Sequence, residues 1–410
     1  MSERLDAVVV GAGQAGLATS RELSRAGIAH VVLERGRVGQ TWRGRWDSFC
    51  LVTPNWSVRL PGRPYDGDQP DAFMSREEIV AYLERYAAGL AARVYEGVGV
   101  SALEPAAEGG FLLHTTAGEL AANAVILCTG AYQRPHRPAH AKTLPAELPQ
   151  IDVDDYRSPA ALPAGPVLVI GSGQSGCQVA EELREAGRDV FLACGRAGWA
   201  PRRIGERDLF WWLRETGELD APLSSLADPA DRLLGNIQAS GRGGGHDLHY
   251  RTLRAMGVTL LGHFRRAQGQ VAWFRDDLAA TVTWSDQRHI RFMQRVRRLA
   301  AERGLPEPPI PEPGRFDAAA PERLDLRGFD AVIFAGGFRP DYAAWVRCPG
   351  AFDALGFPIQ LDGASTVVDG LYFVGVHFLR KRKSSLLLGV GEDAAIVARA
   401  VARRRTLAAV

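Results

Sequence analysis

Two stretches of the chain share the same order of apolar and polar positions. In each, a short continuous apolar run is followed by a glycine-rich loop, a segment with apolar residues at helical spacing, and a second apolar run. The first stretch covers residues 6–34 and the second covers residues 166–196. Continuous apolar runs of this length are typical of buried parallel strands. Each stretch therefore predicts a strand, a helix and a second strand in a parallel α/β unit.

The loop of the first stretch reads Gly-Ala-Gly-Gln-Ala-Gly. In a dinucleotide-binding loop the first glycine permits a tight turn, the second lets the backbone approach a pyrophosphate, and the third lets the helix pack closely on the sheet. The start of the helix offers free N–H groups to phosphate. An acidic residue that ends the second strand can accept hydrogen bonds from a ribose diol. We therefore predict an FAD site that includes Gly11, Gly13, Gln14, Ala15, Gly16, Glu34 and Arg35.

The second stretch repeats the loop as Gly-Ser-Gly-Gln-Ser-Gly but ends without an acid. Arg196 stands at that place, with Arg202 and Arg203 shortly after it. A guanidinium suits the 2′-phosphate of NADP, which a carboxylate would repel. Arg202 and Arg203 are expected as reserves for the same charge. The alternative for Arg196 is an ordinary solvated surface charge. We predict an NADPH site that includes Gly171, Gly173, Gln174, Ser175, Gly176, Arg196 and Arg203.

Three further apolar runs are broken by glycine, at residues 124–135, 331–342 and 370–378. A glycine at the end of a strand lets the backbone approach a ligand closely, although a core strand that ends in a turn has the same pattern. We assign Thr129, Gly130 and Gly375 to the FAD site. Residues 384–405 predict a loop and a helix with arginines in its last turns, and the helix start near Gly389 is expected to face the flavin ring.

These elements predict an α/β fold with two Rossmann-like dinucleotide-binding domains, the second inserted into the first. The FAD domain takes residues 1–155 plus 331–410, and the NADPH domain takes residues 156–330. The aromatic run 210–212 and the glycine-rich run 241–247 are candidates for a lid or a substrate wall, with a core role as the alternative for the Trp pair. Residues 75–89 predict a structural helix with a capping box formed by Ser75 and Glu78.

Composition limits the possible functions. The chain has 410 residues, of which 46% are hydrophobic and 23% charged, enough for two to three globular domains. A formal net charge of +2 does not demand a nucleic acid or membrane partner. Five cysteines without C-x-x-C spacing argue against a zinc site and a redox-active dithiol, and His246 and His249 have no metal-ligand neighbours. No run reaches the length of a membrane span. We expect a cytoplasmic protein that acts on a small molecule.

With these motifs in this order, the chain resembles the class B flavin-dependent monooxygenases, including the flavin-containing monooxygenases and the YUCCA enzymes. The resemblance also rests on residues 39–49, GQTWRGRWDSF, and on the run GLYFVG. It implies that NADPH reduces FAD, and that a flavin hydroperoxide then passes one oxygen atom to a nitrogen, sulfur or carbonyl centre. It also implies that Gln40, Thr41 and Trp42 contact the flavin, and that Asn55 helps to hold the oxygen adduct as the catalytic residue. From the sequence alone, Pro54-Asn55 is typical of a turn.

The linker before the second loop departs from the family pattern F-x-G-x-x-x-H-x-x-x-Y/F. Ala146, Leu148 and Asp152 stand where the pattern has Phe, Gly and His, and only Tyr156 matches. In the family that histidine is linked to domain movement and to NADP handling. The departure favours an alternative, an FAD- and NADPH-dependent reductase or NADPH oxidase without oxygen insertion. A second alternative is a non-catalytic flavin or nicotinamide sensor. The leading interpretation is a monooxygenase that uses molecular oxygen and a small-molecule substrate.

Overall fold

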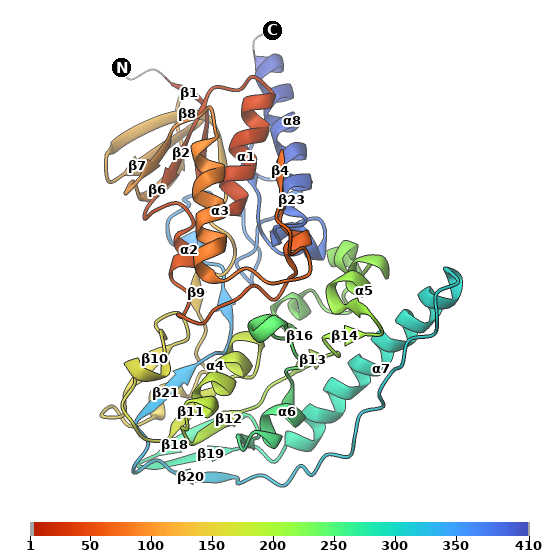
Figure 1. The fold of residues 1–410 in the computed structure, drawn as a ribbon. Helices are drawn as coiled ribbons and strands as arrows, with labels where there is room; N and C mark the ends of the chain where they lie inside the picture. The colour runs from red at the N-terminus through yellow and green to blue at the C-terminus, as the bar shows by residue number, and fades with distance from the viewer. Residues whose placement is uncertain (1–3, 409–410) are drawn as a thin grey trace.

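The two repeated stretches form the centres of two separate sheets, one in each lobe of the molecule (Figure 1). The computed structural model describes residues 4–408. In each stretch the two apolar strands pair in parallel, with a helix between them along the chain. The predicted α/β fold with two dinucleotide-binding units is therefore confirmed.

The sheet of the first lobe has a parallel centre and antiparallel extensions. Its order is β23-β24-β25-β8-β1-β2-β5, and β6 and β7 extend antiparallel from β8. The five strands from β25 to β5 are parallel. The strands are β1 (Leu5–Val10), β2 (His30–Glu34), β5 (Val94–Glu96), β6 (Val100–Pro105), β7 (Phe111–Thr115), β8 (Gly118–Leu127), β23 (Gln360–Leu361), β24 (Ala364–Ser365) and β25 (Leu371–Phe373).

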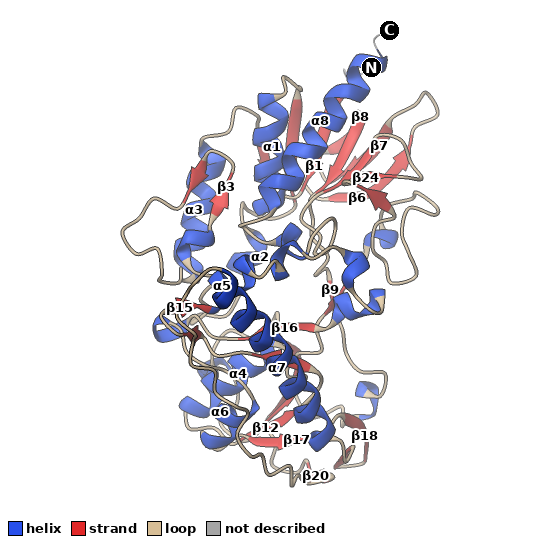
Figure 2. Ribbon diagram, turned by 90° about the vertical axis from the view of Figure 1, so that its right-hand side faces the viewer, coloured by secondary structure: helices blue, strands red, loops and turns tan. Residues whose placement is uncertain are grey.

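Three helices cover one face of this sheet, and β6 and β7 lie on its other side (Figure 2). The helices are α1 (Gln14–Arg25), α3 (Arg76–Ala88) and α8 (Val390–Ala408). Apolar residues such as Leu17 on α1 and Val397 on α8 are fully buried in the core that joins these helices to the sheet. The capping box predicted for α3 is present, because Ser75 accepts from the Glu78 N–H and the Glu78 carboxylate accepts from the Ser75 N–H.

The sheet of the second lobe is parallel throughout, with the order β10-β21-β11-β12-β17. Helices and a three-stranded antiparallel sheet cover its two faces. The sheet strands are β10 (Gln150–Asp152), β11 (Val167–Ile170), β12 (Val190–Ala193), β17 (Thr259–Leu261) and β21 (Ala331–Phe334). The covering elements are α4 (Gln174–Glu185), α6 (Tyr250–Ala255), α7 (Leu278–Glu302), β18 (Phe264–Gln268), β19 (Val271–Phe274) and β20 (Arg323–Asp325).

Several shorter elements lie outside the two large sheets. Trp212 on α5 (Leu209–Glu215) is 2% exposed and packs with Phe292 and Val296 of α7, so it is a core residue. The remaining elements are α2 (Gln40–Arg43), β3 (Arg59–Leu60), β4 (Arg63–Pro64), β9 (Arg134–Pro135), β13 (Ala197–Trp199), β14 (Arg203–Ile204), β15 (Arg207–Asp208), β16 (Gly235–Gln238) and β22 (Phe338–Arg339), together with short 3-10 turns.

The sheets require a correction to both predicted domain boundaries. Residues 150–152 and 331–334 were expected in the first domain, but β10 and β21 pair within the second sheet. A continuous apolar run such as β21 suits the centre of either sheet, so the sequence pattern does not decide between them. The chain crosses between the lobes where β9 pairs with β22. This pair sets the division near residues 135 and 338.

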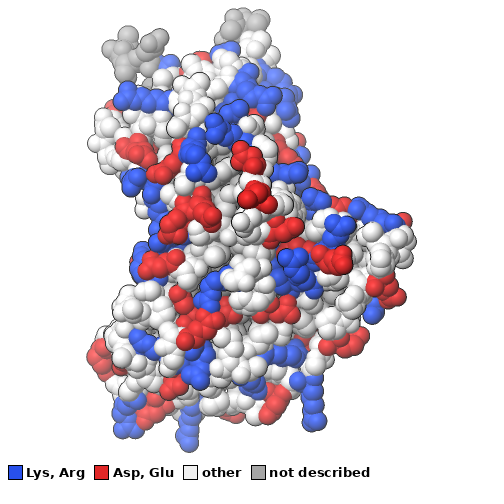
Figure 3. Space-filling model, viewed as in Figure 1, with Lys and Arg blue, Asp and Glu red and all other residues white. Residues whose placement is uncertain are grey.

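Charged side chains of both signs are interspersed over the face shown in Figure 3. The basic run 380–383 is also paired with acids, since Arg380 pairs with Asp362 and Asp393 while Lys381 pairs with Asp220. Within residues 4–408 no helix combines the length and the apolar character needed to cross a bilayer.

Candidate functional site

The three glycines of the first loop occupy three different environments. Gly11 has a φ of +104°, and an added Cβ there would lie 2.9 Å from the carbonyl oxygen of Cys128. A Cβ at Gly16 would overlap the carbonyl oxygen of Gly11. A Cβ at Gly13 would meet no atom within 4 Å, and no side chain caps the start of α1. The loop thus leaves open space in front of free helix N–H groups, which fits a pyrophosphate.

Glu34 ends β2 beside this loop and is 7% exposed. Its Oε2 accepts a hydrogen bond from the Ala12 N–H at 2.8 Å, and its Oε1 accepts from the Gly36 N–H at 2.9 Å. These two amides fix the carboxylate next to the loop. Each carboxylate oxygen keeps a further lone pair. Glu34 can therefore accept from ribose hydroxyls without losing its backbone bonds.

Gln14, the first residue of α1, connects the loop to two distant segments. Its Oε1 accepts from the indole N–H of Trp42 at 2.8 Å, and its Nε2 donates to the Ser385 carbonyl at 3.1 Å. Trp42 lies on α2, and Ser385 lies in the loop before α8. The pattern of residues along the chain gave no sign of Ser385. The bridge brings the FAD loop, α2 and the start of α8 to one place.

The glycines at two other strand ends meet the same loop. Gly375, after β25, has a φ of +85°, and an added Cβ would lie 2.5 Å from the Cβ of Ala15. Thr129 and Gly130 follow β8 next to Gly11, and Gln133 donates to both of them, at 2.9 Å and 2.7 Å. The structure therefore brings these predicted residues together at the carboxyl ends of parallel strands, where α/β folds bind their ligands.

Three other residues predicted for the FAD site have exposed side chains. Gln40 and Thr41 lie on α2, and Arg35 follows Glu34 directly. The side-chain oxygen of Gln40 accepts from the Arg37 N–H at 3.2 Å. The positions of these three residues agree with a role at the rim of the FAD site. The flavin contacts of Gln40 and Thr41 and the cofactor contact of Arg35 remain predictions.

Asn55 begins a 3-10 turn directly after Pro54, as the turn interpretation expects. Its side chain is 5% exposed. The amide nitrogen donates to the Gln69 carbonyl at 3.0 Å, whereas Oδ1 is buried without a partner among the described residues. A buried polar atom without a partner is costly, and functional sites are one place where it is found. The Asn55 amide nitrogen is therefore used in a structural hydrogen bond, while its Oδ1 is free to accept one.

The second loop repeats the geometry of the first. Gly171 has a φ of +109°, a Cβ at Gly176 would overlap the Gly171 carbonyl oxygen, and a Cβ at Gly173 would meet no atom within 4 Å. Gln174 Oε1 accepts from the Ala239 N–H at 3.1 Å, and Ser175 lies in the first turn of α4. The open space at Gly173 fits a second pyrophosphate.

Residues outside the loop hold it in this shape. Gln238 donates to the Ser172 carbonyl at 2.8 Å, and the Ser172 hydroxyl accepts from the Gly195 N–H at 2.8 Å. The Tyr250 hydroxyl lies 2.8 Å from the same Ser172 hydroxyl and is buried, which raises its pKa. These residues come from β16 and α6, and only tertiary structure brings them to the loop.

The arginines that follow β12 separate into two groups. Arg196 and Arg203 are exposed, so both remain available to a phosphate. Arg202 was expected as a reserve for the same charge, and that expectation is wrong. Arg202 is 2% exposed, donates to the Asp208 carboxylate at 2.6 Å and 2.9 Å, and donates to the Val52 carbonyl of the first lobe at 2.8 Å. It joins the two lobes.

The altered linker is tied to the second lobe. Asp152 accepts two hydrogen bonds from Arg137, at 2.8 Å and 3.0 Å, in place of a histidine that could donate. Tyr156, the one residue that matches the family pattern, is buried and donates to Glu182 at 2.9 Å. Burial raises its pKa. Tyr156 therefore has a core role.

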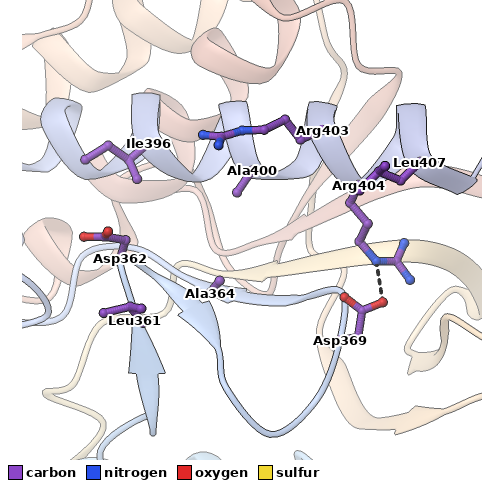
Figure 4. Close-up of a pocket in the computed structure, with 9 residues that line it drawn as sticks. All are labelled: Leu361, Asp362, Ala364, Asp369, Ile396, Ala400, Arg403, Arg404 and Leu407. Atoms are coloured by element: carbon purple, nitrogen blue, oxygen red, sulfur yellow. Dashed lines mark hydrogen bonds and ion pairs between the residues drawn. The ribbon is translucent and has the colours of Figure 1, made fainter.

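The hollow in Figure 4 lies away from both glycine loops. This groove of about 610 Å³ runs between the second half of α8 and the β23–β24 hairpin, with Leu361, Ala400 and Leu407 among its walls and the Arg404–Asp369 ion pair at one end. The predicted dinucleotide sites lie instead at the first turns of α1 and α4. Among residues 4–408, no three His, Cys, Asp or Glu side chains are grouped to hold a metal ion.

Comparison with known proteins agrees with this geometry. A family model described as pyridine nucleotide-disulphide oxidoreductase matches residues 8–214, which contain both glycine loops. The chain belongs to this family. An uncharacterised CzcO-like oxidoreductase of Geobacillus kaustophilus is 30% identical over 96% of this chain and 97% of its own length. The predicted class of enzyme, an oxidoreductase, is confirmed.

Two further relatives agree with the resemblance to flavin monooxygenases. Indole-3-pyruvate monooxygenase YUCCA1 of Oryza sativa is 34% identical over 182 residues, which are 43% of this chain and 44% of its own length. A flavin-containing monooxygenase from Stenotrophomonas maltophilia has the same fold, with a TM-score of 0.68 at 20% identity, over 98% of this chain and 99% of its own. The predicted resemblance to class B flavin monooxygenases is confirmed.

Proposed function

We propose that this protein is an FAD- and NADPH-dependent monooxygenase that transfers one oxygen atom to a nitrogen, sulfur or carbonyl centre of a small molecule. The observation that carries the proposal is the pair of open glycine loops, one followed by the buried acid Glu34 and the other by the exposed base Arg196. A carboxylate at this position favours an unmodified ribose, and a guanidinium favours a 2′-phosphate. The two sites thus differ in the ligand that they select.

The residues of the first lobe would hold FAD in a defined orientation. The α1 N-terminus would bind the pyrophosphate, and Glu34 would accept from the ribose. Trp42, fixed by Gln14, would line the far end of the site near the start of α8. The chemistry that a bound flavin supplies is two-electron transfer from NADPH to dioxygen. The partnerless Oδ1 of Asn55 would accept a hydrogen bond from a group that enters the site.

A second candidate function is an NADPH oxidase that reduces oxygen to hydrogen peroxide without inserting it. The Asp152–Arg137 ion pair favours this candidate, because a carboxylate occupied by an arginine cannot replace the hydrogen-bond donor that the family pattern has there. Both candidates consume NADPH and oxygen. They differ in their products, because the monooxygenase places one oxygen atom in an organic product whereas the oxidase releases both as hydrogen peroxide.

Measurement of product stoichiometry separates the candidates. Purified yellow protein is supplied with NADPH and a panel of thioethers, amines and cyclic ketones while NADPH, oxygen and hydrogen peroxide are followed. A monooxygenase forms one oxygenated product per NADPH with one substrate class, and peroxide falls correspondingly. Peroxide equal to NADPH with every substrate supports the oxidase. Protein without flavin after reconstitution contradicts both candidates.

A further inference from the structure

Helix α7 lies next to the segment that carries Arg196. It packs on β13, the strand that begins directly after Arg196. An added Cβ at Gly198 in β13 would lie 3.8 Å from both Cβ and Cδ of Arg288 on α7. Arg288 therefore projects along the backbone that follows the second strand of the NADPH unit, where the adenosine ribose binds in this type of fold.

Trp284 lies one turn before Arg288 on the same face of α7. The guanidinium carbon of Arg288 is 4.6 Å from the centre of its ring, and that of Arg196 is 6.0 Å from the same centre. Cation–π attraction acts at these distances. The ring centre of the half-buried Trp284 thus lies within 6.0 Å of two guanidinium groups, one from α7 and one from the loop after β12.

Neither guanidinium group of this pair forms an ion pair among residues 4–408, although the Asp231 and Glu218 carboxylates lie near Arg288. Glu218 bonds Arg295 instead. Burial and the neighbouring Arg291 charge lower the pKa of Arg288, and the Asp231 and Glu218 carboxylates only partly oppose this effect. A half-buried cation without an acidic partner loses hydration and gains no compensating bond. Such a cluster is suited to an anion that enters from solution.

We propose that Arg288 binds the 2′-phosphate of NADP(H) together with Arg196, and that Trp284 is a positioning residue for both guanidinium groups. The two arginines offer several N–H donors to a dianionic phosphate. The proposal rests on the proposed function only in its choice of ligand, a 2′-phosphorylated nicotinamide dinucleotide. It does not depend on oxygen insertion.

Binding of a ligand fragment tests this inference without catalysis. Calorimetry on the flavin-loaded protein compares 2′,5′-ADP, which carries the 2′-phosphate, with 5′-AMP, which lacks it. Arg288→Gln is expected to weaken 2′,5′-ADP binding about 10- to 100-fold, as for a lost charge-assisted hydrogen bond. Binding of 5′-AMP should change less than about 3-fold. Arg298→Gln, an exposed arginine on the same helix, is the matched control and should leave both ligands unaffected.

Two further variants distinguish a binding role from a structural one. Arg288→Lys should recover part of the affinity because it restores the charge, and Trp284→Leu should weaken 2′,5′-ADP selectively. Flavin absorbance and circular dichroism verify that each variant is folded. If the wild type prefers 2′,5′-ADP over 5′-AMP and Arg288→Gln binds both ligands as the wild type does, the role of Arg288 is overturned while the proposed function stands. A wild-type protein that does not prefer 2′,5′-ADP over 5′-AMP overturns the NADPH part of the proposed function as well.

Discussion

Alanine at Gly13 and at Gly16 should separate ligand binding from folding within a single loop. The two positions are three residues apart, and each substitution adds one Cβ. At Gly13 the backbone has φ −79° and ψ −172°, which alanine adopts without strain, and the Cβ enters open space. At Gly16 the Cβ would overlap the Gly11 carbonyl oxygen. That oxygen belongs to the backbone, so it cannot turn aside as a flexible side chain would.

The magnitudes follow from these environments. Alanine at Gly13, the residue before the helix, should change the free energy of unfolding by no more than a few tenths to about 1 kcal/mol. Alanine inside a helix gains about 1 kcal/mol over glycine. Overpacking at Gly16 costs about 1–3 kcal/mol, and the upper end applies because the clash is with backbone. We therefore expect Gly16→Ala to lower the free energy of unfolding by about 1–2 kcal/mol.

Urea unfolding followed by circular dichroism measures stability without added cofactor, and fluorescence titration measures FAD affinity. Gly13→Ala should unfold like the wild type but bind FAD at least about 10-fold more weakly, because its Cβ takes the space of the pyrophosphate. Gly173→Ala is the matched variant and should weaken NADPH rather than FAD. A Gly16→Ala variant as stable as the wild type, or a Gly13→Ala variant that binds FAD normally, would contradict these expectations.

Two other predictions concern the second lobe. Arg202→Met should lower the free energy of unfolding by about 3–5 kcal/mol, because the buried Asp208 loses its partner. The exposed Arg203→Met is the control. Equal effects of the two substitutions on urea unfolding would contradict the prediction. His249 caps α6 by accepting from two backbone N–H groups, and burial lowers its pKa to about 4. Because this folded value is below the unfolded value of about 6.5, the contribution of roughly 3 kcal/mol is present above pH 6.5 and is lost as the pH falls toward 4. His249→Asn retains a capping oxygen and should flatten the profile of unfolding free energy between pH 4 and 6.5, and an unchanged profile would count against this assignment.

The parts that the sequence predicted are those set by backbone geometry. A glycine loop between an apolar strand and a helix has few conformations available, so the separate environments of Gly11, Gly13 and Gly16 follow from their spacing. The same holds for the capping box of α3, because its bonds join residues three positions apart. Loop conformations and capping hydrogen bonds of this kind can be predicted from a short stretch of sequence.

The parts that it did not predict depend on contacts between distant residues. Gln14 and Ser385 are separated by 371 positions, and a backbone carbonyl has no signature in the sequence. Arg202 directly precedes Arg203, a residue predicted to bind phosphate, but its guanidinium instead forms an ion pair with Asp208 and a hydrogen bond to Val52 inside the protein. An arginine near a phosphate loop has several possible partners. Only the fold decides which one it meets.

The linker shows how a departure from the family pattern can be structural. Asp152 ends β10, and Arg137 lies two residues after β9, where the chain crosses between the lobes. The bidentate ion pair joins this crossing to the second sheet, and the Arg137 guanidinium also lies 4.5 Å from the ring centre of Phe334, at the end of β21. A histidine at position 152 would leave Arg137 without this partner. The carboxylate therefore holds the crossing segment against the second lobe.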